Sequence, residues 1–167
     1  MVKRPVRIGV IGSGRSHPKW DPWAEQVGRR VAEAEAVLIC GGLSGVMAAA
    51  AKGARQAGGT TIGIRAGTYS DDSNPDITIP IPTWLGDGRN LLVVQSSDFV
   101  IAIGGGAGTL SEIGFSLKLR KPLILLGSWE VKVPDGGDPL PVTPYVVDTP
   151  DEAVQLAMRL SRKSFRP

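Results

Sequence analysis

Residues 104–112, with the sequence GGGAGTLSE, carry the strongest chemical signal in this chain. They follow an apolar run at 99–103 and precede a helical pattern, so they form a strand-to-helix turn. Glycines let a backbone come close to an anion, and the start of a helix offers unpaired N–H groups with a partial positive charge. We therefore predict a phosphate cradle with the backbone and one hydroxyl as donors. Its residues are Gly105, Gly106, Gly108 and Thr109.

The same segment differs from two familiar phosphate-binding loops. No lysine follows the glycines as in a Walker A loop, and the glycine spacing is not that of the dinucleotide fingerprint. Thr109 and Glu112 also fit a capping box, in which Glu112 would only cap the helix. Two interpretations of Glu112, a helix cap and a functional group of the site, therefore stay open.

Two further glycine-rich turns follow predicted strands. Residues 41–47 (GGLSGVM) again join a strand to a helix, for which Ser44 is the predicted N-cap. We predict that Gly42 and Ser44 line the same ligand, although these glycines would equally serve close packing of a helix on a strand. Residues 12–16 (GSGRS) are a weaker case, in which Ser13 either donates to the ligand or is an exposed loop residue.

Single charged and titratable side chains add further candidates. Arg89, in GDGRN at 86–90, can clamp a phosphate bidentately at the start of a predicted helix; the alternative is a surface arginine. His17 is the only histidine, and we interpret it as a polar loop residue rather than as an acid or base. Because Cys40 is also the only residue of its type, the sequence predicts no metal site built by the protein.

Tryptophan offers a flat surface on which a ring can stack. Trp84 and Trp129 lie near predicted strand ends, where such stacking on a ligand is conceivable. Packing in the core or between subunits is the interpretation that we favour for these two and for Trp20 and Trp23.

The net charge of +3 and the pI of about 9.2 favour an anionic ligand. A C-terminal basic group has no interleaved aromatic residues, so we interpret it as a solvated helix face and predict no nucleic-acid partner. Its members are Arg159, Arg162, Lys163 and Arg166. A single cysteine favours a reducing compartment. The sequence has no signal-peptide pattern and no apolar run of about 18 residues, so we predict a cytoplasmic protein without a membrane partner.

Apolar runs alternate with helical patterns along the whole chain, which is typical of βα units. Strands are predicted at 6–11, 37–40, 60–64, 77–81, 99–103, 122–126 and 145–147. Helices are predicted at 22–35, 44–57, 89–96, 109–119 and 150–162, with a polar loop at 65–75 and a Gly/Pro-rich loop at 135–141. We predict one domain, residues 1–167, of the α/β class: a Rossmann-like doubly wound, mostly parallel sheet with helices on both faces. In such folds the ligand lies beyond the carboxyl ends of the strands, near the switch point.

Two of these motifs resemble those of the Lonely Guy superfamily, long labelled "possible lysine decarboxylase". Its members carry GGG-x-x-G-L-M at the position of residues 41–47 and P-G-G-x-G-T-x-x-E at the position of 104–112. The resemblance covers nearly the whole chain, and it implies a homodimer or homotetramer. Apolar helix residues supply a candidate interface: Val93, Val94, Phe115 and Leu117. We see no context for a lysine that binds pyridoxal phosphate, so lysine decarboxylation is not predicted.

Two branches of the superfamily differ in function. Cytokinin-activating phosphoribohydrolases cleave the N-glycosidic bond of nucleoside 5′-monophosphates, and their active-site arginine and glutamate match Arg89 and Glu112. Molybdenum cofactor carrier proteins bind a phosphorylated molybdopterin and protect it. This chain is more similar to the carriers, because it has Gly104 where the hydrolases have proline and Asn90 where they have a second basic residue.

The resemblance therefore implies a carrier with the molybdenum cofactor as bound cargo and no metal held by the protein itself. The residues expected to hold the cargo are Ser13, Gly42, Ser44, Arg89, Gly105, Gly106, Gly108, Thr109 and Glu112. One alternative is a nucleoside monophosphate phosphoribohydrolase, with Arg89 and Glu112 as catalytic residues, and another is a non-catalytic nucleotide sensor. In each case the expected partner is a phosphorylated small molecule.

Overall fold

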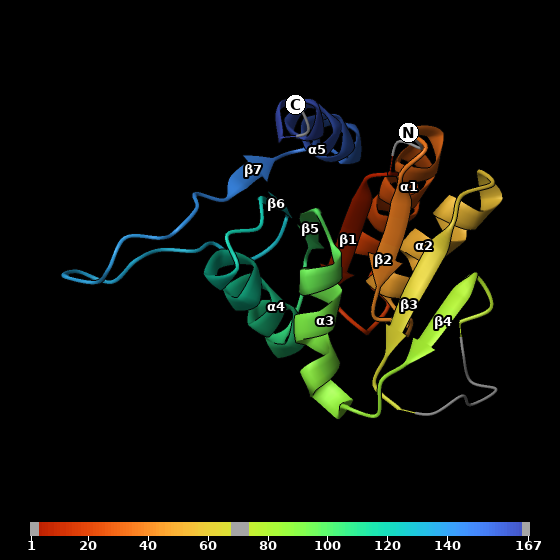
Figure 1. Ribbon diagram of the computed structural model, residues 1–167, viewed down its shortest axis with the longest axis horizontal. Helices are drawn as coiled ribbons and strands as arrows, with labels where there is room; N and C mark the ends of the chain where they lie inside the picture. The colour runs from red at the N-terminus through yellow and green to blue at the C-terminus, as the bar shows by residue number, and fades with distance from the viewer. Residues whose placement is uncertain (1–3, 68–73, 165–167) are drawn as a thin grey trace.

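The computed structural model describes residues 4–67 and 74–164, where seven strands form one sheet in the order β4-β3-β2-β1-β5-β6-β7 (Figure 1). The strands are β1 (Arg7–Gly12), β2 (Val37–Cys40), β3 (Thr61–Arg65), β4 (Ile79–Pro82), β5 (Phe99–Ile103), β6 (Leu123–Leu126) and β7 (Tyr145–Val147). The predicted α/β Rossmann-like fold is confirmed, and each described strand pair is parallel. Arg166 and residues 68–73 of the predicted polar loop lie outside the described residues.

Helices cover both faces of this sheet (Figure 1). They are α1 (Trp20–Glu33), α2 (Val46–Gln56), α3 (Arg89–Ser96), α4 (Ala107–Lys118) and α5 (Pro150–Ser164), with a short 3₁₀ turn η1 (Gly86–Gly88). Helices α1, α2 and α5 share one buried apolar cluster with the strands, and α3 and α4 share a second. Strands β5 and β6 are buried along their whole length, as expected for central parallel strands. Within the described ranges, no helix is both long and apolar enough to cross a membrane.

Helices α1 and α2 approach each other closely because each has a glycine at the contact. A Cβ atom on Gly28 would collide with the carbonyl oxygen of Ala50, and one on Gly53 would collide with that of Glu25. Only a residue without a Cβ atom permits such an approach of two backbones. The close contact fixes α1 and α2 relative to each other, and with them the turns from which both helices start.

The predicted subunit interface is wrong for residues that the sheet itself buries. Val93, Val94 and Leu117 lie in the cluster of α3 and α4 against the sheet, and the half-buried Phe115 packs on it. An apolar helix face has the same sequence pattern whether it covers a sheet or another subunit. A homo-oligomer stays a prediction, but these residues are core residues of one chain.

Residues 127–144, between β6 and β7, form an extended arm (Figure 1). The predicted Gly/Pro-rich loop at 135–141 lies within it, so the excursion is longer than expected. Val131, Leu140 and Val142 pack against the cluster of α3 and α4, which holds the arm to the body of the protein.

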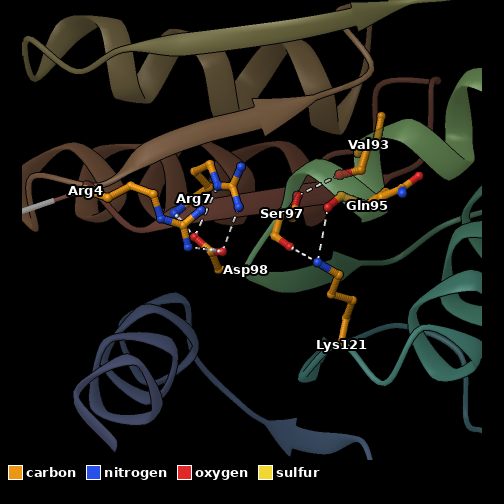
Figure 2. Close-up of polar contacts among 7 residues, drawn as sticks. All are labelled: Arg4, Arg7, Val93, Gln95, Ser97, Asp98 and Lys121. Atoms are coloured by element: carbon orange, nitrogen blue, oxygen red, sulfur yellow. Dashed lines mark hydrogen bonds and ion pairs between the residues drawn. The ribbon is translucent and has the colours of Figure 1, made fainter. Parts of the chain in front are cut away.

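A charged cluster lies at the amino ends of the central strands (Figure 2). Asp98, just before β5, accepts hydrogen bonds from the backbone N–H of Arg7 at 2.9 Å and from the guanidinium of Arg7 at 2.9 and 3.3 Å. Arg4 adds an ion pair of 2.9 Å. Lys121, just before β6, donates to the carbonyl oxygens of Ser97 at 2.6 Å and Gln95 at 3.1 Å. These contacts join the starts of three strands that are far apart in the sequence.

Candidate ligand-binding site

Three glycine-rich turns lie side by side at the carboxyl edge of the sheet. They follow β2, β1 and β5, which are neighbours in the sheet. The chain leaves β1 toward β2 on one side, and β5 pairs on the other, so β1 and β5 flank the switch point. Ligands of doubly wound folds bind in the crevice at this point. The predicted placement of the turns is therefore what the structure shows.

The turns after β1 and β2 interlock. The N–H of Val46 donates to the carbonyl oxygen of Ser13 at 2.9 Å, and the Ser44 hydroxyl donates to that of Gly14 at 2.6 Å. Gly45 has a φ of +63°, and a Cβ atom on it would collide with the Ser13 carbonyl. Ser44 as the cap of α2 is wrong: the N-cap is Gly45 and no side chain caps the helix.

In these interlocked turns, the hydroxyls of Ser13 and Ser44 both form hydrogen bonds with the backbone. The Ser44 hydroxyl uses its proton within the turns, and the Ser13 hydroxyl accepts the N–H of Arg15 at 3.0 Å. Gly42 has a φ of +69° and is buried against Gly63. Their contacts with a ligand stay a prediction.

The glycines of the turn after β5 differ in whether the backbone requires them. Gly105 has a φ of +120°, and a Cβ atom there would lie 2.5 Å from the Thr109 side chain. Gly106 is the N-cap of α4 at a φ of −114°, and a Cβ atom on it would meet nothing within 4 Å. Gly105 is therefore needed to make the turn, whereas Gly106 leaves the start of α4 open. The first N–H groups of a helix have no partner within it, so this opening suits an anion.

The capping-box interpretation of Thr109 and Glu112 is wrong. Helix α4 begins at Ala107, so Thr109 is its third residue and Glu112 its sixth, and no side chain caps it. Glu112 instead points from the second turn into the protein and is only 7% exposed. Burial raises the pKa of its carboxyl to about 7, and the charge of Arg89 acts in the opposite direction.

Arg89 is not a surface arginine. It is the first residue of α3 and is 7% exposed. Its guanidinium lies on Gly41, where any Cβ atom would collide with it, and Nη1 donates to the carbonyl oxygen of Ile64 at 3.3 Å. Its Nε is buried and has no hydrogen-bond partner among the described residues. A buried donor without a partner is costly, and such unsatisfied groups are often found at functional sites.

Cys40 is buried and lies within the electrostatic influence of both Arg89 and Glu112. Burial raises the pKa of its thiol to about 11; the N–H of Gly42 and the charge of Arg89 oppose this effect, and the charge of Glu112 adds to it. The thiol is therefore neutral at physiological pH. Within residues 4–67 and 74–164, no three His, Cys, Asp or Glu side chains are grouped so that they could hold a metal ion.

A short chain of hydrogen bonds links α3 to the start of α4. The Asn90 amide donates to the Ser111 hydroxyl at 3.0 Å, and this hydroxyl donates to the carbonyl oxygen of Gly108 at 2.6 Å. Sequence reasoning did not select Ser111, because the only signal is its position three residues after Gly108. The link joins the start of α3, which holds Arg89, to the glycine turn that opens α4.

An aromatic cavity of about 290 Å³ opens beside the glycine turn that follows β5. Its lining residues are Trp20, Gly104, Gly105, Gly127, Ser128 and Trp129. His17 stacks on Trp20 with a distance of 4.0 Å between ring centroids. Trp84, the other tryptophan considered for stacking, is 72% exposed in the loop after β4.

The comparisons with known proteins agree with this architecture. A model of the SLOG cluster4 family matches residues 5–154. The chain belongs to this family. The predicted membership in the Lonely Guy superfamily is thereby confirmed. An uncharacterized protein of Archaeoglobus fulgidus is 38% identical to the chain over 165 residues, which cover 95% of this chain and 98% of that protein.

Two solved structures of similar proteins superpose on this chain over almost its whole length. The molybdenum cofactor binding protein of the phototrophic bacterium Rippkaea orientalis superposes with a TM-score of 0.84 at 34% identity, over 95% of this chain and 98% of its own. The molybdenum cofactor carrier protein of Chlamydomonas reinhardtii superposes with a TM-score of 0.82 at 32% identity, over 95% and 99%. The chain is therefore similar in fold and length to proteins that bind this cofactor.

Proposed function

We propose that this protein binds and carries a small phosphorylated ligand, the molybdenum cofactor, at the carboxyl edge of its sheet. The observation that carries the proposal is the open start of α4, where nothing lies within 4 Å of a Cβ position on Gly106. Helix α4 also has no side-chain cap, so its first N–H groups are left to accept a phosphate as a partner. The similarity to the proteins of Rippkaea orientalis and Chlamydomonas reinhardtii supports the choice of cargo.

The residues around the start of α4 have three tasks in this proposal. The N–H groups of the turn and of the first turn of α4 hold the phosphate, at Gly105, Gly106, Gly108 and Thr109. Arg89 supplies a buried positive charge that water screens little, which favours an anion nearby. Glu112 borders the site, and its raised pKa keeps much of the carboxyl neutral at pH 7, which lessens its repulsion of a phosphate.

A nucleoside monophosphate phosphoribohydrolase is the second candidate, and one observation favours it. A carboxyl group with a pKa of about 7 can both accept and donate a proton at neutral pH. With Arg89 on the phosphate, Glu112 could protonate a leaving base or activate water. The two candidates need the same cradle and differ in whether a bond is broken.

The first experiment incubates the purified protein with AMP and related monophosphates and measures free base by chromatography, beside calorimetry with the molybdenum cofactor. For a carrier we expect saturable binding of the cofactor and no release of base. Release of adenine that is lost in Glu112→Gln, with the fold intact, would overturn the carrier function in favour of the hydrolase. Absence of binding to the cofactor would contradict the proposed cargo.

A further inference from the structure

The aromatic cavity beside the glycine turn is built by residues from three separate parts of the chain. Trp20 is the first residue of α1, Gly104 and Gly105 follow β5, and Trp129 is the third residue of the arm after β6. The Ser128 hydroxyl donates to the carbonyl oxygen of Gly104 at 2.5 Å and so ties the arm to the turn. Both ends of the cavity wall are thus fixed by the fold.

Glycines are required for this wall. Gly104 has a φ of +56°, and a Cβ atom on it would collide with the indole of Trp20. Gly127 has a φ of +57°, where an L side chain is strained. Gly104 brings the backbone against the indole of Trp20, and Gly127 brings it against that of Trp23, while both glycines also line the cavity.

Trp129 is 39% exposed, although tryptophan gains much from burial. Its indole lines the cavity together with that of Trp20, and His17 supports Trp20 from its own loop. A partly exposed indole beside this cavity offers a stacking surface to any flat aromatic ring, because each such ring has a π face.

The size of the cavity decides what part of a ligand it can take. Sites for small molecules measure about 300 to 1,000 Å³, so this open cavity of about 290 Å³ lies at the lower limit and is large enough for a fused ring. Gly105 lines this cavity and also contacts Thr109 in the phosphate cradle. A ring in the cavity and a phosphate at the start of α4 are therefore neighbours.

We infer that this cavity is the subsite for a flat fused heterocycle, of which pterin and purine rings are examples, with Trp129 as its stacking residue. The inference rests on the proposed function, since the phosphate of the same ligand would occupy the cradle. Trp129 thus contributes to the affinity for ring-bearing ligands only, and the cradle contributes to the affinity for phosphates with or without a ring.

The test measures the affinity of the full chain for three probes by calorimetry: pterin (a ring without phosphate), ribose 5-phosphate (a phosphate without a flat ring) and AMP. Trp129→Ala should weaken the binding of pterin and AMP about tenfold or more and leave ribose 5-phosphate unchanged. Trp129→Phe, which keeps a flat ring, should retain most of the affinity. Trp84→Ala is the matched control and should bind all three probes like the wild type.

The outcomes separate the two proposals. If Trp129→Ala binds pterin and AMP as tightly as the wild type, the ring subsite is wrong. If ribose 5-phosphate binds but AMP binds no tighter and pterin does not bind, the subsite fails alone. If pterin binds in a manner that depends on Trp129 and the phosphate adds nothing, the subsite stands and the phosphate cradle fails. If no probe binds, both are overturned.

Discussion

At the amino ends of β1 and β5, Asp98 accepts hydrogen bonds from Arg7 and forms an ion pair with Arg4. At the carboxyl edge of the sheet, by contrast, Arg89 and Glu112 are buried and form few hydrogen bonds. Burial works against ionisation of Asp98, but the bonds and charge of Arg7 and the charge of Arg4 hold its pKa below the usual value. For Glu112, burial prevails over Arg89 and raises the pKa to about 7. The same kinds of side chain thus have opposite effects on stability at the two edges.

This difference supports the proposal that the carboxyl edge binds a ligand, whereas the paired charges of the amino edge stabilise the fold. A carboxylate with a lowered pKa stabilises the folded state when ionised, whereas one with a raised pKa destabilises it. Strained or unsatisfied polar groups that persist in a fold are typical of functional sites. The amino edge has its charges paired, and the carboxyl edge leaves a donor of Arg89 and the open start of α4 for something else to complete.

The largest effect is expected from Gly106→Val, which fills the open start of α4. Two or three charge-assisted hydrogen bonds of about 1.5–3 kcal/mol each would be lost, so the affinity for ribose 5-phosphate should fall at least about hundredfold. Stability should change little, because the φ of −114° suits a side chain and a Cβ atom meets nothing within 4 Å. Gly105→Val is the contrast: its φ of +120° should make it unfold more readily as well. If a folded Gly106→Val protein bound phosphate as tightly as the wild type, the proposal that the carboxyl edge binds the ligand would be wrong.

A pH dependence of stability is expected next, and it has opposite signs at the two edges. The folded-state pKa of Glu112 is raised from 4.5 to about 7, so the unfolded chain binds fewer protons between these values and stability falls as pH rises through them. Between pH 5 and pH 8 this amounts to about 2–3 kcal/mol. Denaturant titrations at both pH values should show the loss in the wild type and not in Glu112→Gln. Equal losses in both proteins would assign the pH dependence to other groups.

Asp98→Ala should cost about 2 kcal/mol at neutral pH, because Arg7 and Arg4 lose their anion and the starts of β1 and β5 lose a link. The contribution of Asp98 is present above its unfolded pKa of about 3.8 and is lost as pH falls through the lowered folded pKa. Thermal unfolding of the wild type should therefore show extra acid sensitivity below about pH 4 that the variant lacks. Asp87→Ala, at an exposed position, is the control. A ligand affinity that falls with Asp98→Ala would contradict the division into two edges.

Much of the fold could be predicted because its signals are local. Apolar runs that end in glycines marked β2 at 37–40 and β5 at 99–103, and the glycine turns marked the carboxyl edge. Strand order and side-chain partners depend on contacts between distant residues. The Ser44 hydroxyl bonds to Gly14 in another turn instead of capping its own helix, and no local pattern indicates that choice.

The pattern T-x-x-E illustrates the limit, because it occurs twice with different outcomes. At 149–152 it is a true capping box: the N–H of Glu152 donates to the Thr149 hydroxyl, and the N–H of Thr149 donates to the Glu152 carboxylate. At 109–112 the helix has already begun at Ala107, so Glu112 is left to the buried site. The helix start after Thr149 is fixed by Pro150, a common first helical residue, and the earlier segment has no such marker.

The smallest effect, that of Ser111→Ala, tests whether the carboxyl edge is a rigid frame. The substitution removes the acceptor of the buried Asn90 amide and the donor to the Gly108 carbonyl, so about 1 kcal/mol of stability should be lost. Because this link orients the start of α4 relative to Arg89, the affinity for ribose 5-phosphate should also fall, by about threefold to fivefold. Thr149→Ala removes the cap of α5, a helix that contributes no predicted site residue, and should cost about the same stability, with the affinity unchanged. If Ser111→Ala lost stability alone, like the cap variant, then the cradle would be held by the glycine turn itself, and the hydrogen-bond link between α3 and α4 would belong to the stabilising part of the molecule.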